Sequence, residues 1–302
     1  MKVSVIIPTF NRAEMVCGAI NSILNQTLKD FEIIVVDNCS IDNTESVIKS
    51  YNDKRIRYFR HQNNGILAVN MNYGMKQARG EYIAFCDDDD IWMPDKLEKQ
   101  LAEFEKDDKI ALVCTNGIAF DETGETGLAA KSHLHDGDFT LKSLIRINLI
   151  ISSSILVKKS VIDEVGMMDE EPEIFGAEEY GLWIRIAKKY KIKYIDLPLM
   201  KYRTHPGAYR NKGTRDIVAK EYIYRKLLKE KIIDTSFYNK SINRLNYERI
   251  IIKFLNADKD INLYMIRTTK TDIWKKCLLI GIYFLFRVKL LNAVRHMQFN
   301  VT

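Results

Sequence analysis

Four consecutive aspartates, Asp87–Asp90, are the residues of this chain whose type and spacing point most directly to chemistry. They follow the apolar run Tyr82–Cys86, and such a run bounded by polar residues is typical of a buried strand. Four carboxylates this close repel one another, so some must bind protons or a cation. Mg²⁺ and Mn²⁺ prefer oxygen ligands, and Mg²⁺ sites use one or two carboxylates plus substrate phosphates. A solvated acidic loop is the alternative.

The elements that must position the aspartates alternate between strands and helices. Near-continuous apolar runs predict strands at 3–7, 31–36, 56–59, 82–86 and 110–114. Helical spacing of apolar residues predicts helices at 13–25, 44–49, 66–78 and 94–104. After residue 115 the pattern loosens, with strands predicted at 152–157, 192–195 and 199–202. This order predicts an α/β fold with a mostly parallel, Rossmann-like sheet flanked by helices.

Ligands of such sheets bind beyond the carboxyl ends of the strands. Here the polar residues at those ends are Thr9, Asn11, Arg12, Asp37 and the acidic run. The first turn, residues 8–12, contains no glycine and is therefore neither a dinucleotide fingerprint nor a P-loop. Phosphate charge would have to be met by a metal ion or by side chains, and the aspartates supply the means for the first.

Composition sets further limits on the kind of protein. The 302 residues are 46% hydrophobic and 28% charged, which is typical of a globular chain. The five cysteines are scattered without a CxxC spacing, which argues against a disulfide framework or a zinc site. The apolar part of the amino terminus is too short for a signal peptide, so we expect a cytoplasmic protein.

The last third of the chain differs in charge. Residues 210–302 carry 20 Lys and Arg against 8 Asp and Glu, a net charge of +12, which leaves −6 for residues 1–209 because the total is +6. We expect a catalytic domain at 1–209 and a basic helical extension at 210–302. Its helices are predicted at about 215–231, 235–256 and 272–295. Residues 277–286 are uncharged and flanked by cations, which indicates a helix in the membrane interface, with a packed terminal helix as the alternative.

Ordered motifs across residues 3–207 resemble those of the inverting, nucleotide-sugar-dependent glycosyltransferases of family 2, which have the type-A glycosyltransferase fold. The motifs are Val5–Arg12, Ile34–Asp42, Asn64–Gly65, Asn72–Gly74, Ala78–Ile83, Asp87–Trp92, Lys96–Leu97, Gly166–Glu170, Glu178–Arg185 and Tyr202–His205. Each motif alone is weak, and their order and spacing together are specific.

The resemblance implies a role for each polar strand end. Asp37 would contact the nucleotide base, with Thr9 and Arg12 in the same pocket. Asp89 would bind Mn²⁺ or Mg²⁺ between the two phosphates, and Asp87 or Asp88 would contact the ribose. The implied nucleotide-binding residues are Pro8, Thr9, Asn11, Arg12, Asp37, Asn64, Asp87, Asp88 and Arg203. The implied metal ligands are Asp89, Asp87 and His205, and Asp90 either faces the acceptor or is structural.

Inversion in one displacement requires a carboxylate that deprotonates the acceptor hydroxyl. In the family this base belongs to a Glu-Asp pair at the start of a late helix, and the pair here is Glu178-Glu179. Glu179 occupies the base position, and Glu178 is a second candidate. The helix dipole favours acidic residues at a helix start in any case. The family often has Arg where this chain has Met71, and Gly-Phe in place of residues 167–168, which affects base recognition and the acceptor-side loop.

These features predict an inverting glycosyltransferase that moves a hexose from a nucleoside-diphosphate sugar, with UDP as the expected nucleotide. The expected acceptor is a hydroxyl of a glycan or lipid-linked oligosaccharide in surface polysaccharide synthesis, at the inner face of the cell membrane. The alternatives are a sugar-phosphate nucleotidyltransferase, which usually has a glycine-rich first loop, and a nucleotide- or nucleic-acid-binding module. The second leaves the aspartates unexplained, because carboxylates repel phosphate, and we expect no nucleic-acid partner.

Overall fold

The structure, a computed structural model, describes residues 1–130, 137–204 and 215–255. The chain divides into two compact units. The first comprises Met1–Pro172 and Ala177–Ala208, and the second Glu173–Gly176 and Tyr209–Thr302. His205 and the helix predicted at 272–295 lie outside the described residues.

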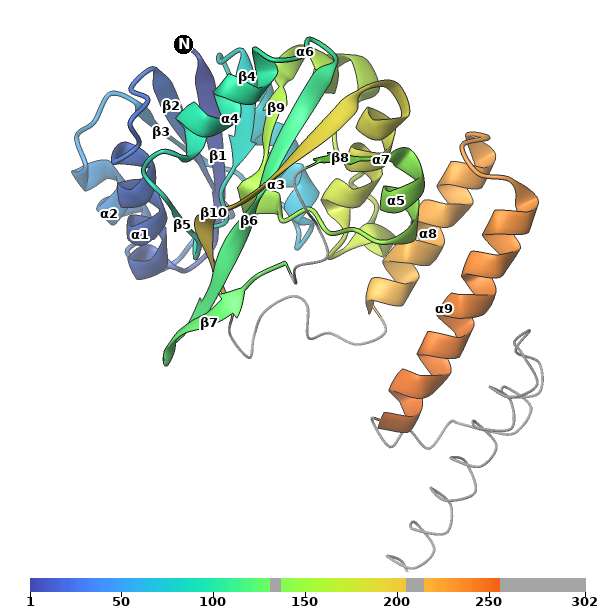
Figure 1. The fold of residues 1–302 in the computed structure, drawn as a ribbon. Coiled ribbons are helices and arrows are strands. Elements are labelled where there is room, and N and C mark those ends of the chain that lie inside the picture. The colour runs from blue at the N-terminus through green and yellow to red at the C-terminus, as the bar shows by residue number, and fades with distance from the viewer. Residues whose placement is uncertain (131–136, 205–214, 256–302) are drawn as a thin grey trace, which may run out of the picture. The chain divides into compact units, whose positions relative to one another are not determined.

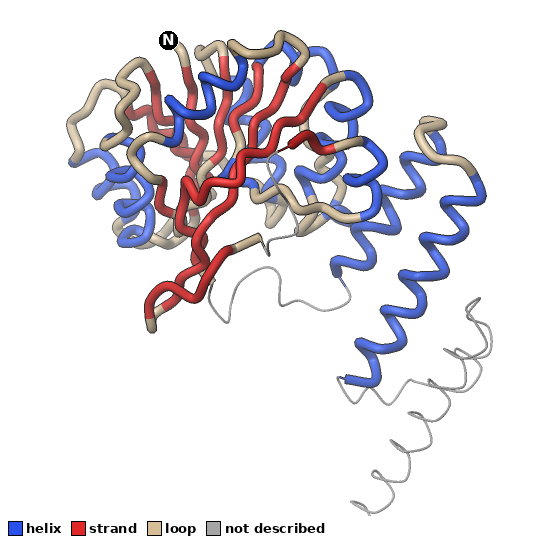
Figure 2. Tube along the Cα trace, in the orientation of Figure 1, coloured by secondary structure: helices blue, strands red, loops and turns tan. Residues whose placement is uncertain are grey.

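A twisted sheet runs through the first unit, with helices around it (Figures 1 and 2). Its strand order is β3-β2-β1-β4-β9-β6-β10-β5, and β7 and β8 pair with β6 and β10. The strands are β1 (Val3–Thr9), β2 (Phe31–Asp37), β3 (Ile56–Arg60), β4 (Tyr82–Phe85), β5 (Ile91–Trp92), β6 (Ile110–Asp121), β7 (Gly124–Leu128), β8 (Gly137–Phe139), β9 (Leu156–Lys158) and β10 (Lys191–Arg203). Strands β3, β2, β1 and β4 are parallel, whereas β9 and β5 are antiparallel to their neighbours. The predicted α/β class is confirmed.

The helices of this unit lie on both faces of the sheet. They are α1 (Ala13–Leu24), α2 (Thr44–Ser50), α3 (Leu67–Gln77), α4 (Lys96–Phe104), α5 (Leu141–Arg146), α6 (Lys159–Val165) and α7 (Glu178–Lys189). Short 3₁₀ turns occur at η1 (Ser152–Ser154) and η2 (Pro172–Ile174). Because side chains alternate along a strand, one face of the central strands packs on α3 and α7 and the other on α1 and α4.

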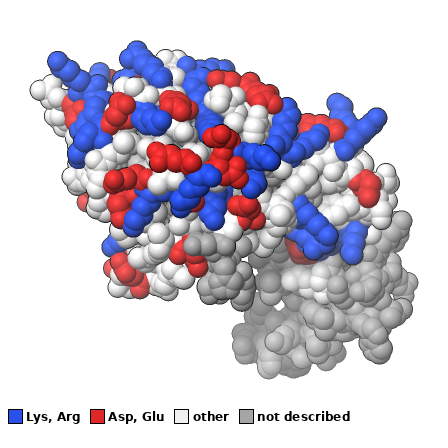
Figure 3. Space-filling view, turned by 45° about the horizontal axis from the view of Figure 1, so that its top comes forward, with Lys and Arg blue, Asp and Glu red and all other residues white. Residues whose placement is uncertain are grey.

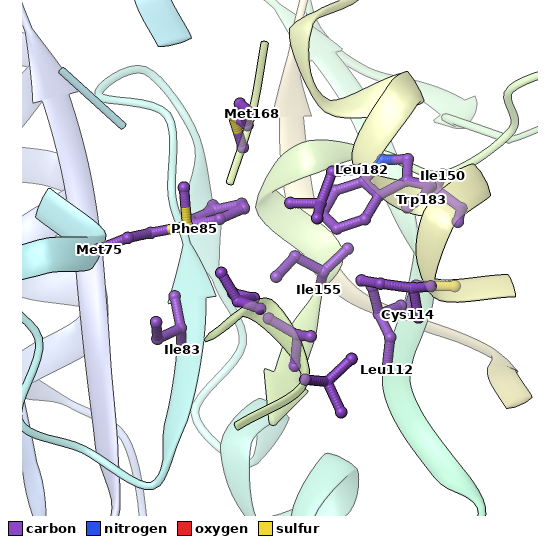
Figure 4. Packing of buried hydrophobic residues seen from close by; sticks show 14 of the residues in the cluster. Met75, Ile83, Phe85, Leu112, Cys114, Ile150, Ile155, Met168, Leu182 and Trp183 are labelled. Atoms are coloured by element: carbon purple, nitrogen blue, oxygen red, sulfur yellow. The ribbon is translucent and has the colours of Figure 1, made fainter. Parts of the chain in front are cut away.

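The core on the α3 and α7 side brings distant parts of the sequence together. Phe85 at the end of β4 lies beside Trp183 of α7, with ring centroids 6.2 Å apart (Figure 4). Both side chains are fully buried. This packing fixes the start of α7 close to the strand end from which the acidic run leaves.

The strand predicted at 152–157 is wrong in its first half. Residues Ser152–Ser154 form a 3₁₀ turn, and the strand begins at Leu156. The Ser154 hydroxyl donates to the Ile151 carbonyl at 2.7 Å, and such local side-chain bonds compete with strand pairing. The two strands predicted at 192–195 and 199–202 are instead one strand, β10, whose register against β6 shifts around Pro198.

The described part of the second unit contains a pair of helices, α8 (Arg215–Lys229) and α9 (Thr235–Leu255). The pair is held by an ion pair between Arg249 and Glu221, 2.7 Å long, and by edge-to-face contact of Tyr224 and Phe237. Within residues 1–130, 137–204 and 215–255, no helix has the length and apolar character needed to cross a bilayer.

Candidate active site

Parallel pairing brings the polar ends of β1, β2 and β4 to one edge of the sheet. Thr9 lies directly opposite Asp37. Ile6 lies opposite Phe85, so that the acidic run leaves β4 at the level where β1 approaches its end. The structure therefore confirms the prediction that these strand ends lie together at one edge of the sheet.

Asn11 joins the turns that follow β1 and β2. Its backbone N–H donates to the Ser40 hydroxyl at 2.8 Å, and its side-chain oxygen accepts the Ile41 N–H at 2.8 Å. Two other predicted nucleotide-binding residues differ in exposure: Pro8 is buried within β1, and Asn64 is exposed in a left-handed turn with φ 52°. Asn11 thus fixes the relative position of the two turns that border the rim.

Burial alternates along the acidic run. Asp88 and Asp90 are 4% and 0% exposed, whereas Asp87 and Asp89 are partly accessible. A solvated acidic loop would expose all four, so that alternative is wrong. Figure 3 shows basic and acidic side chains interspersed over the face in view. The accessible pair, Asp87 and Asp89, is the pair placed to meet a ligand.

Asp88 is braced from the first turn. The Thr9 hydroxyl donates to its Oδ2 at 2.7 Å, and Arg12 Nη1 donates to its Oδ1 at 2.8 Å. The same Arg12 nitrogen reaches Asp89 Oδ2 at 3.0 Å. Both oxygens of Asp88 are therefore engaged within the protein, and Arg12 supplies positive charge to the run.

Asp90 and Arg203 connect the run to the end of β10. The Arg203 backbone N–H donates to Asp90 Oδ1 at 2.9 Å, and Arg203 Nε donates to the Asp89 carbonyl at 3.1 Å. The guanidinium lies over the Phe120 ring, 4.4 Å from its centroid. These three contacts hold one cation at a fixed place beside the aspartates.

The carboxylates of the run have unusual proton affinities. Burial and then repulsion from Asp90 and Asp89 raise the pKa of Asp87 well above its usual value. Burial, followed by repulsion from Asp89, raises the pKa of Asp90 to about 7. Burial also raises the pKa of Asp88, opposed by Arg12 and Thr9. The positive charge near the run is therefore too small to offset the repulsion among its carboxylates. A bound cation would reduce that repulsion.

A metal ion at the acidic run would need coordinating atoms from bound phosphate or water in addition to the aspartates. Among residues 1–130, 137–204 and 215–255, no group of three or more Asp, Glu, His or Cys side chains is arranged to hold an ion. Mg²⁺ commonly takes one or two carboxylates and completes its octahedron with phosphate and water. Asp87 and Asp89 fit that pattern, since both are partly accessible oxygen donors.

The start of α7 lies beside the run. Glu178 is 2% exposed, and Glu179 is partly accessible. Burial raises the pKa of Glu179, while its own backbone N–H and the Ser152 hydroxyl lower it. The charge of Glu179 contributes to the raised pKa of Asp87, and the packing of Trp183 against Phe85 holds α7 beside the end of β4. The structure thus unites carboxylates about ninety positions apart in sequence.

Asp37 is fully buried and held by Ser40, which belongs to the same motif, and by Tyr58, which lies outside the motifs. Its Oδ1 accepts the Ser40 N–H and hydroxyl at 2.9 and 2.6 Å, and its Oδ2 accepts the Tyr58 hydroxyl at 2.5 Å. Burial and this hydrogen bond raise the pKa of Tyr58. One exposed aromatic side chain was also missed: Phe10, 50% exposed, follows Thr9 at the rim.

The two departures from the family pattern have structural consequences. Met71 is 1% exposed within the core, where it packs on the α3 side of the sheet. Asn72 anchors the following loop: its Oδ1 accepts the Met168 N–H at 3.0 Å, and its Nδ2 donates to the Met168 carbonyl and to Glu170 Oε1 at 2.9 and 2.7 Å. The loop after α6 is therefore tied to α3.

Comparison with known sequences decides the family. The profile described as glycosyl transferase family 2 matches residues 4–166. The chain belongs to this family. An uncharacterized glycosyltransferase of Rickettsia conorii is 37% identical over 210 residues, which are 67% of this chain and 34% of that protein. The chain thus spans about a third of that relative's length.

Two further matches agree with the family and the fold. A Campylobacter jejuni protein named GalNAc(5)-diNAcBac-PP-undecaprenol beta-1,3-glucosyltransferase is 33% identical over 210 residues, 67% of this chain and 64% of that protein. The crystal structure of Staphylococcus aureus TarS 1–349 with UDP-GlcNAc superposes with a TM-score of 0.65 at 16% identity, covering 97% of this chain and 92% of that one. The type-A glycosyltransferase fold is thereby confirmed.

Proposed function

We propose that this glycosyltransferase moves a hexose from a UDP-sugar to an acceptor hydroxyl with inversion at the anomeric carbon. The observation that supports the proposal is the packing of Trp183 against Phe85, which brings the helix that begins with Glu178 and Glu179 to the end of the strand from which the acidic run leaves. Asp87 and Asp89 suit the diphosphate side of the reaction, and Glu179 suits the acceptor side. The TarS complex with UDP-GlcNAc supports the choice of nucleotide.

The donor side would use the residues around the acidic run. Asp89, with Asp87, would hold Mn²⁺ or Mg²⁺ on the diphosphate side of the site. The ion would act as a Lewis acid that stabilises the departing nucleoside diphosphate. Arg203, fixed over Phe120, would add a cation beside the diphosphate. Asp88 would act indirectly, because its two oxygens already accept bonds from Thr9 and Arg12.

The nucleoside would lie over the ends of β1 and β2. Asp37 would contact the base, although its carboxylate is 0% exposed and bonded to Ser40 and Tyr58 before the donor binds. Phe10 would offer an exposed face for stacking, which binds any base because every base has a π-face. Asn11 would keep the two turns together, and the exposed Asn64 would border the pocket. The buried Met71 would take no part.

Glu179 would act as the general base. Its raised pKa makes it a stronger proton acceptor than an exposed carboxylate, provided that it is ionised. As the acceptor oxygen attacks the anomeric carbon, its proton passes to Glu179 and the bond to the diphosphate breaks on the opposite face. This geometry inverts the anomeric configuration. Glu178 is the second candidate, and its 2% exposure fits acceptor contact less well.

The acceptor would be a lipid-linked oligosaccharide at the inner face of the cell membrane, as in surface polysaccharide synthesis. The printed name of the Campylobacter relative, which includes a pyrophosphate-linked undecaprenol, supports this class. In this proposal residues 1–209 catalyse transfer, and the basic segment 210–302, net charge +12, contacts anionic lipid. Sedimentation with phosphatidylglycerol vesicles, compared with phosphatidylcholine vesicles, tests the contact.

Turnover of nucleotide sugars tests the whole proposal. The purified chain with Mn²⁺ is incubated with UDP- and GDP-sugars and with undecaprenyl-pyrophosphate-linked glycans, and released nucleoside diphosphate is measured. We expect UDP release that depends on metal and acceptor, and an inverted anomeric proton coupling in the product by NMR. Absence of transfer and hydrolysis for every donor, with no nucleotide binding by calorimetry, overturns the proposal. Pyrophosphate release from a nucleoside triphosphate indicates a nucleotidyltransferase.

A further inference from the structure

The last residue of β10, Arg203, is held between two segments that are far apart in sequence. On one side, its backbone N–H donates to Asp90 Oδ1 at 2.9 Å, and its Nε donates to the Asp89 carbonyl at 3.1 Å. On the other side, Arg203 pairs in register with Phe120 of β6. The guanidinium carbon lies 4.4 Å from the centroid of the Phe120 ring. Both the backbone and the side chain of Arg203 are therefore fixed.

The hairpin of β6 and β7 carries Phe120 and is itself tied to the end of β10. The Thr204 N–H and the Thr204 hydroxyl both donate to the Phe120 carbonyl, at 2.8 and 3.2 Å. Two residues before Arg203, Lys201 forms an ion pair of 2.7 Å with Glu125 of β7. The residues on both sides of Arg203 are thus bound to the hairpin, which restricts where the guanidinium can point.

The bonding of Asp90 is unusual for a residue that only stabilises a fold. Its side chain is 0% exposed, and its Oδ2 has no hydrogen-bond partner among the residues that the structure describes. A buried carboxylate oxygen without a partner lowers the stability of a protein. Its other oxygen accepts the Arg203 N–H. Asp90 therefore holds Arg203 at a cost in stability, which is common for residues of functional sites.

The sheet order places Arg203 across the acidic run from the nucleoside end of the site. The strands β1 and β2, which end in Thr9 and Asp37, lie on one side of β4, and β10 lies beyond β9 and β6 on the other. Arg12 contacts the run from the β1 side, through Asp88, and Arg203 contacts it from the β10 side. A ligand whose nucleoside lies over β1 and β2 would therefore extend its terminal phosphate toward Arg203.

The guanidinium of Arg203 keeps donors for such a phosphate. An arginine side chain carries five N–H donors in a planar fork, which can bind phosphate oxygens in a bidentate arrangement. The Nε donor is used by the Asp89 carbonyl, and the two terminal nitrogens make no hydrogen bond to the residues that the structure describes. The Phe120 ring contacts the face of the guanidinium and leaves its edge available.

We propose that Asp90 and Phe120 are positioning residues for Arg203, and that they direct its guanidinium at the terminal phosphate of the nucleoside diphosphate. This inference rests on the proposed function. A guanidinium that is already oriented stabilises the negative charge that develops on the departing diphosphate without having to reorganise. It also distinguishes a nucleoside diphosphate from a nucleoside monophosphate, which lacks the terminal phosphate. Asp90 takes up no proton and binds no metal in this scheme.

Substitution of Asp90 separates a positioning role from a direct one. Asp90→Ala removes the acceptor of the Arg203 N–H, and it should lower kcat by about 5- to 20-fold, the factor that one or two hydrogen bonds represent. Asp90→Asn keeps an oxygen that can accept the same N–H, and it should recover most of the lost kcat. A metal ligand or a proton acceptor would lose as much rate in Asp90→Asn as in Asp90→Ala, and that result overturns the inference.

Substitution of Phe120 tests the other side of Arg203. Phe120→Leu keeps an apolar side chain and removes the ring, and it should lower kcat by about 3- to 10-fold. Phe120→Tyr keeps a ring face and should recover most of that loss. Glu125→Gln is the matched control, because it breaks an exposed ion pair on the same hairpin, and it should leave kcat unchanged. A folded Phe120→Leu variant with the wild-type kcat overturns the role of Phe120.

Nucleotide binding gives a measurement that does not depend on transfer. The Kd of UDP with Mn²⁺ should rise by about 5- to 10-fold in Asp90→Ala, Phe120→Leu and Arg203→Met, whereas the Kd of UMP should stay unchanged. Asp90→Ala should add less than twofold to the effect of Arg203→Met, because the positioned cation is already gone. Equal losses for UDP and UMP, or effects of Asp90→Ala and Arg203→Met that multiply fully, overturn the inference.

The two kinds of measurement separate this inference from the proposed function. Circular dichroism and the Tm of each variant are measured alongside, so that a loss of structure is recognised. If the wild-type chain transfers no sugar but the variants weaken UDP binding and not UMP binding, the proposed function is wrong and the positioning of Arg203 is supported. A wild-type chain that binds neither nucleotide overturns both.

Discussion

The two halves of the site hold their carboxylates in different ways. On the donor side, Asp88 accepts bonds from Thr9 and Arg12, and Asp37 accepts three bonds from two neighbours. On the base side, burial raises the pKa of Glu179, and its own backbone N–H and the Ser152 hydroxyl lower it only in part. The donor side is therefore held rigid before any ligand arrives, whereas the base side keeps a carboxylate with few partners.

This difference suits two different tasks. A diphosphate carries fixed charge, and binding it requires groups that are already oriented. A general base must take up a proton, and a carboxylate with few hydrogen bonds keeps the raised pKa that favours uptake. The arrangement follows the general pattern in which acids and bases are told apart by environments that separate their pKa values.

The largest effect should come from the accessible aspartate of the donor side. Asp89→Asn removes a charge from the metal position, and we expect transfer to fall at least about 1,000-fold, because a metal contributes several kcal/mol to stabilising the transition state. Metal-dependent binding of UDP by calorimetry should also be lost. Asp163→Asn, which changes an exposed ion pair on α6, is the control and should leave transfer and UDP binding unchanged. If the Asp89→Asn variant keeps the metal dependence of the wild type, Asp89 is not a metal ligand.

The next effect separates the two glutamates of the base side. Glu179→Gln should lower kcat by about 100- to 1,000-fold, within the range of general bases, because the amide cannot accept the proton. UDP binding should stay intact. Glu178→Gln is the comparison and should retain most of kcat, since its side chain is buried. If Glu178→Gln lowers kcat more than Glu179→Gln does, Glu178 is the base. The proposed difference between the donor side and the base side would then be wrong.

A smaller effect should follow from loosening the donor side. Thr9→Val keeps the shape of the side chain and removes the donor to Asp88 Oδ2. Leaving a buried carboxylate oxygen without its partner should lower the free energy of unfolding by about 1 to 3 kcal/mol and raise the donor KM more than it lowers kcat. Urea denaturation and steady-state kinetics measure both. A change confined to kcat would show that this brace serves the base side instead.

Much of the donor side could be predicted from the sequence for a physical reason. Strands buried on both faces are near-continuous apolar runs, so their ends are visible in the sequence, and parallel pairing then places those ends together. This reasoning located Asp37, Thr9 and Asp87–Asp90 at one rim, as the structure has them. It did not reveal that Asp88 is braced by Arg12, because such contacts depend on the side-chain directions of folded turns.

The base side was harder to predict because its parts meet only through long-range packing. The turn at Ser152–Ser154 has the composition of a strand end or a loop, and its position depends on contacts with Asp87, Trp92 and Gln100, more than fifty positions earlier in the chain. The position of Glu179 follows from the burial of Trp183 against Phe85. Only the resemblance to a family directed attention to Glu179, and no periodicity would have done so.

The smallest effect on catalysis is expected at Lys96, a fully buried lysine of α4. Its Nζ lies 3.9 Å from the Trp92 ring centroid and 2.8 Å from Gln100 Oε1. Burial lowers the pKa of Lys96 from its usual 10.5 to about 7. Between these values the unfolded chain binds a proton that the folded chain has released. The free energy of unfolding should therefore rise with pH from about 7 to about 10, by at most about 1.4 kcal/mol per pH unit.

Lys96→Met should abolish this increment, because methionine fills similar space without a titrating group. Urea denaturation of both proteins at pH 7, 8 and 9 measures the difference in slope, with Lys99→Met on the exposed side of α4 as the control. Equal slopes for wild type and Lys96→Met would mean that Lys96 keeps its proton in the fold. In that case the wild type has a smaller pH dependence than expected, and Lys96→Met should change the free energy of unfolding mainly through its contacts with Trp92 and Gln100. Among the residues that the structure describes, Arg12 and Arg203 are cations that contact the acidic run directly.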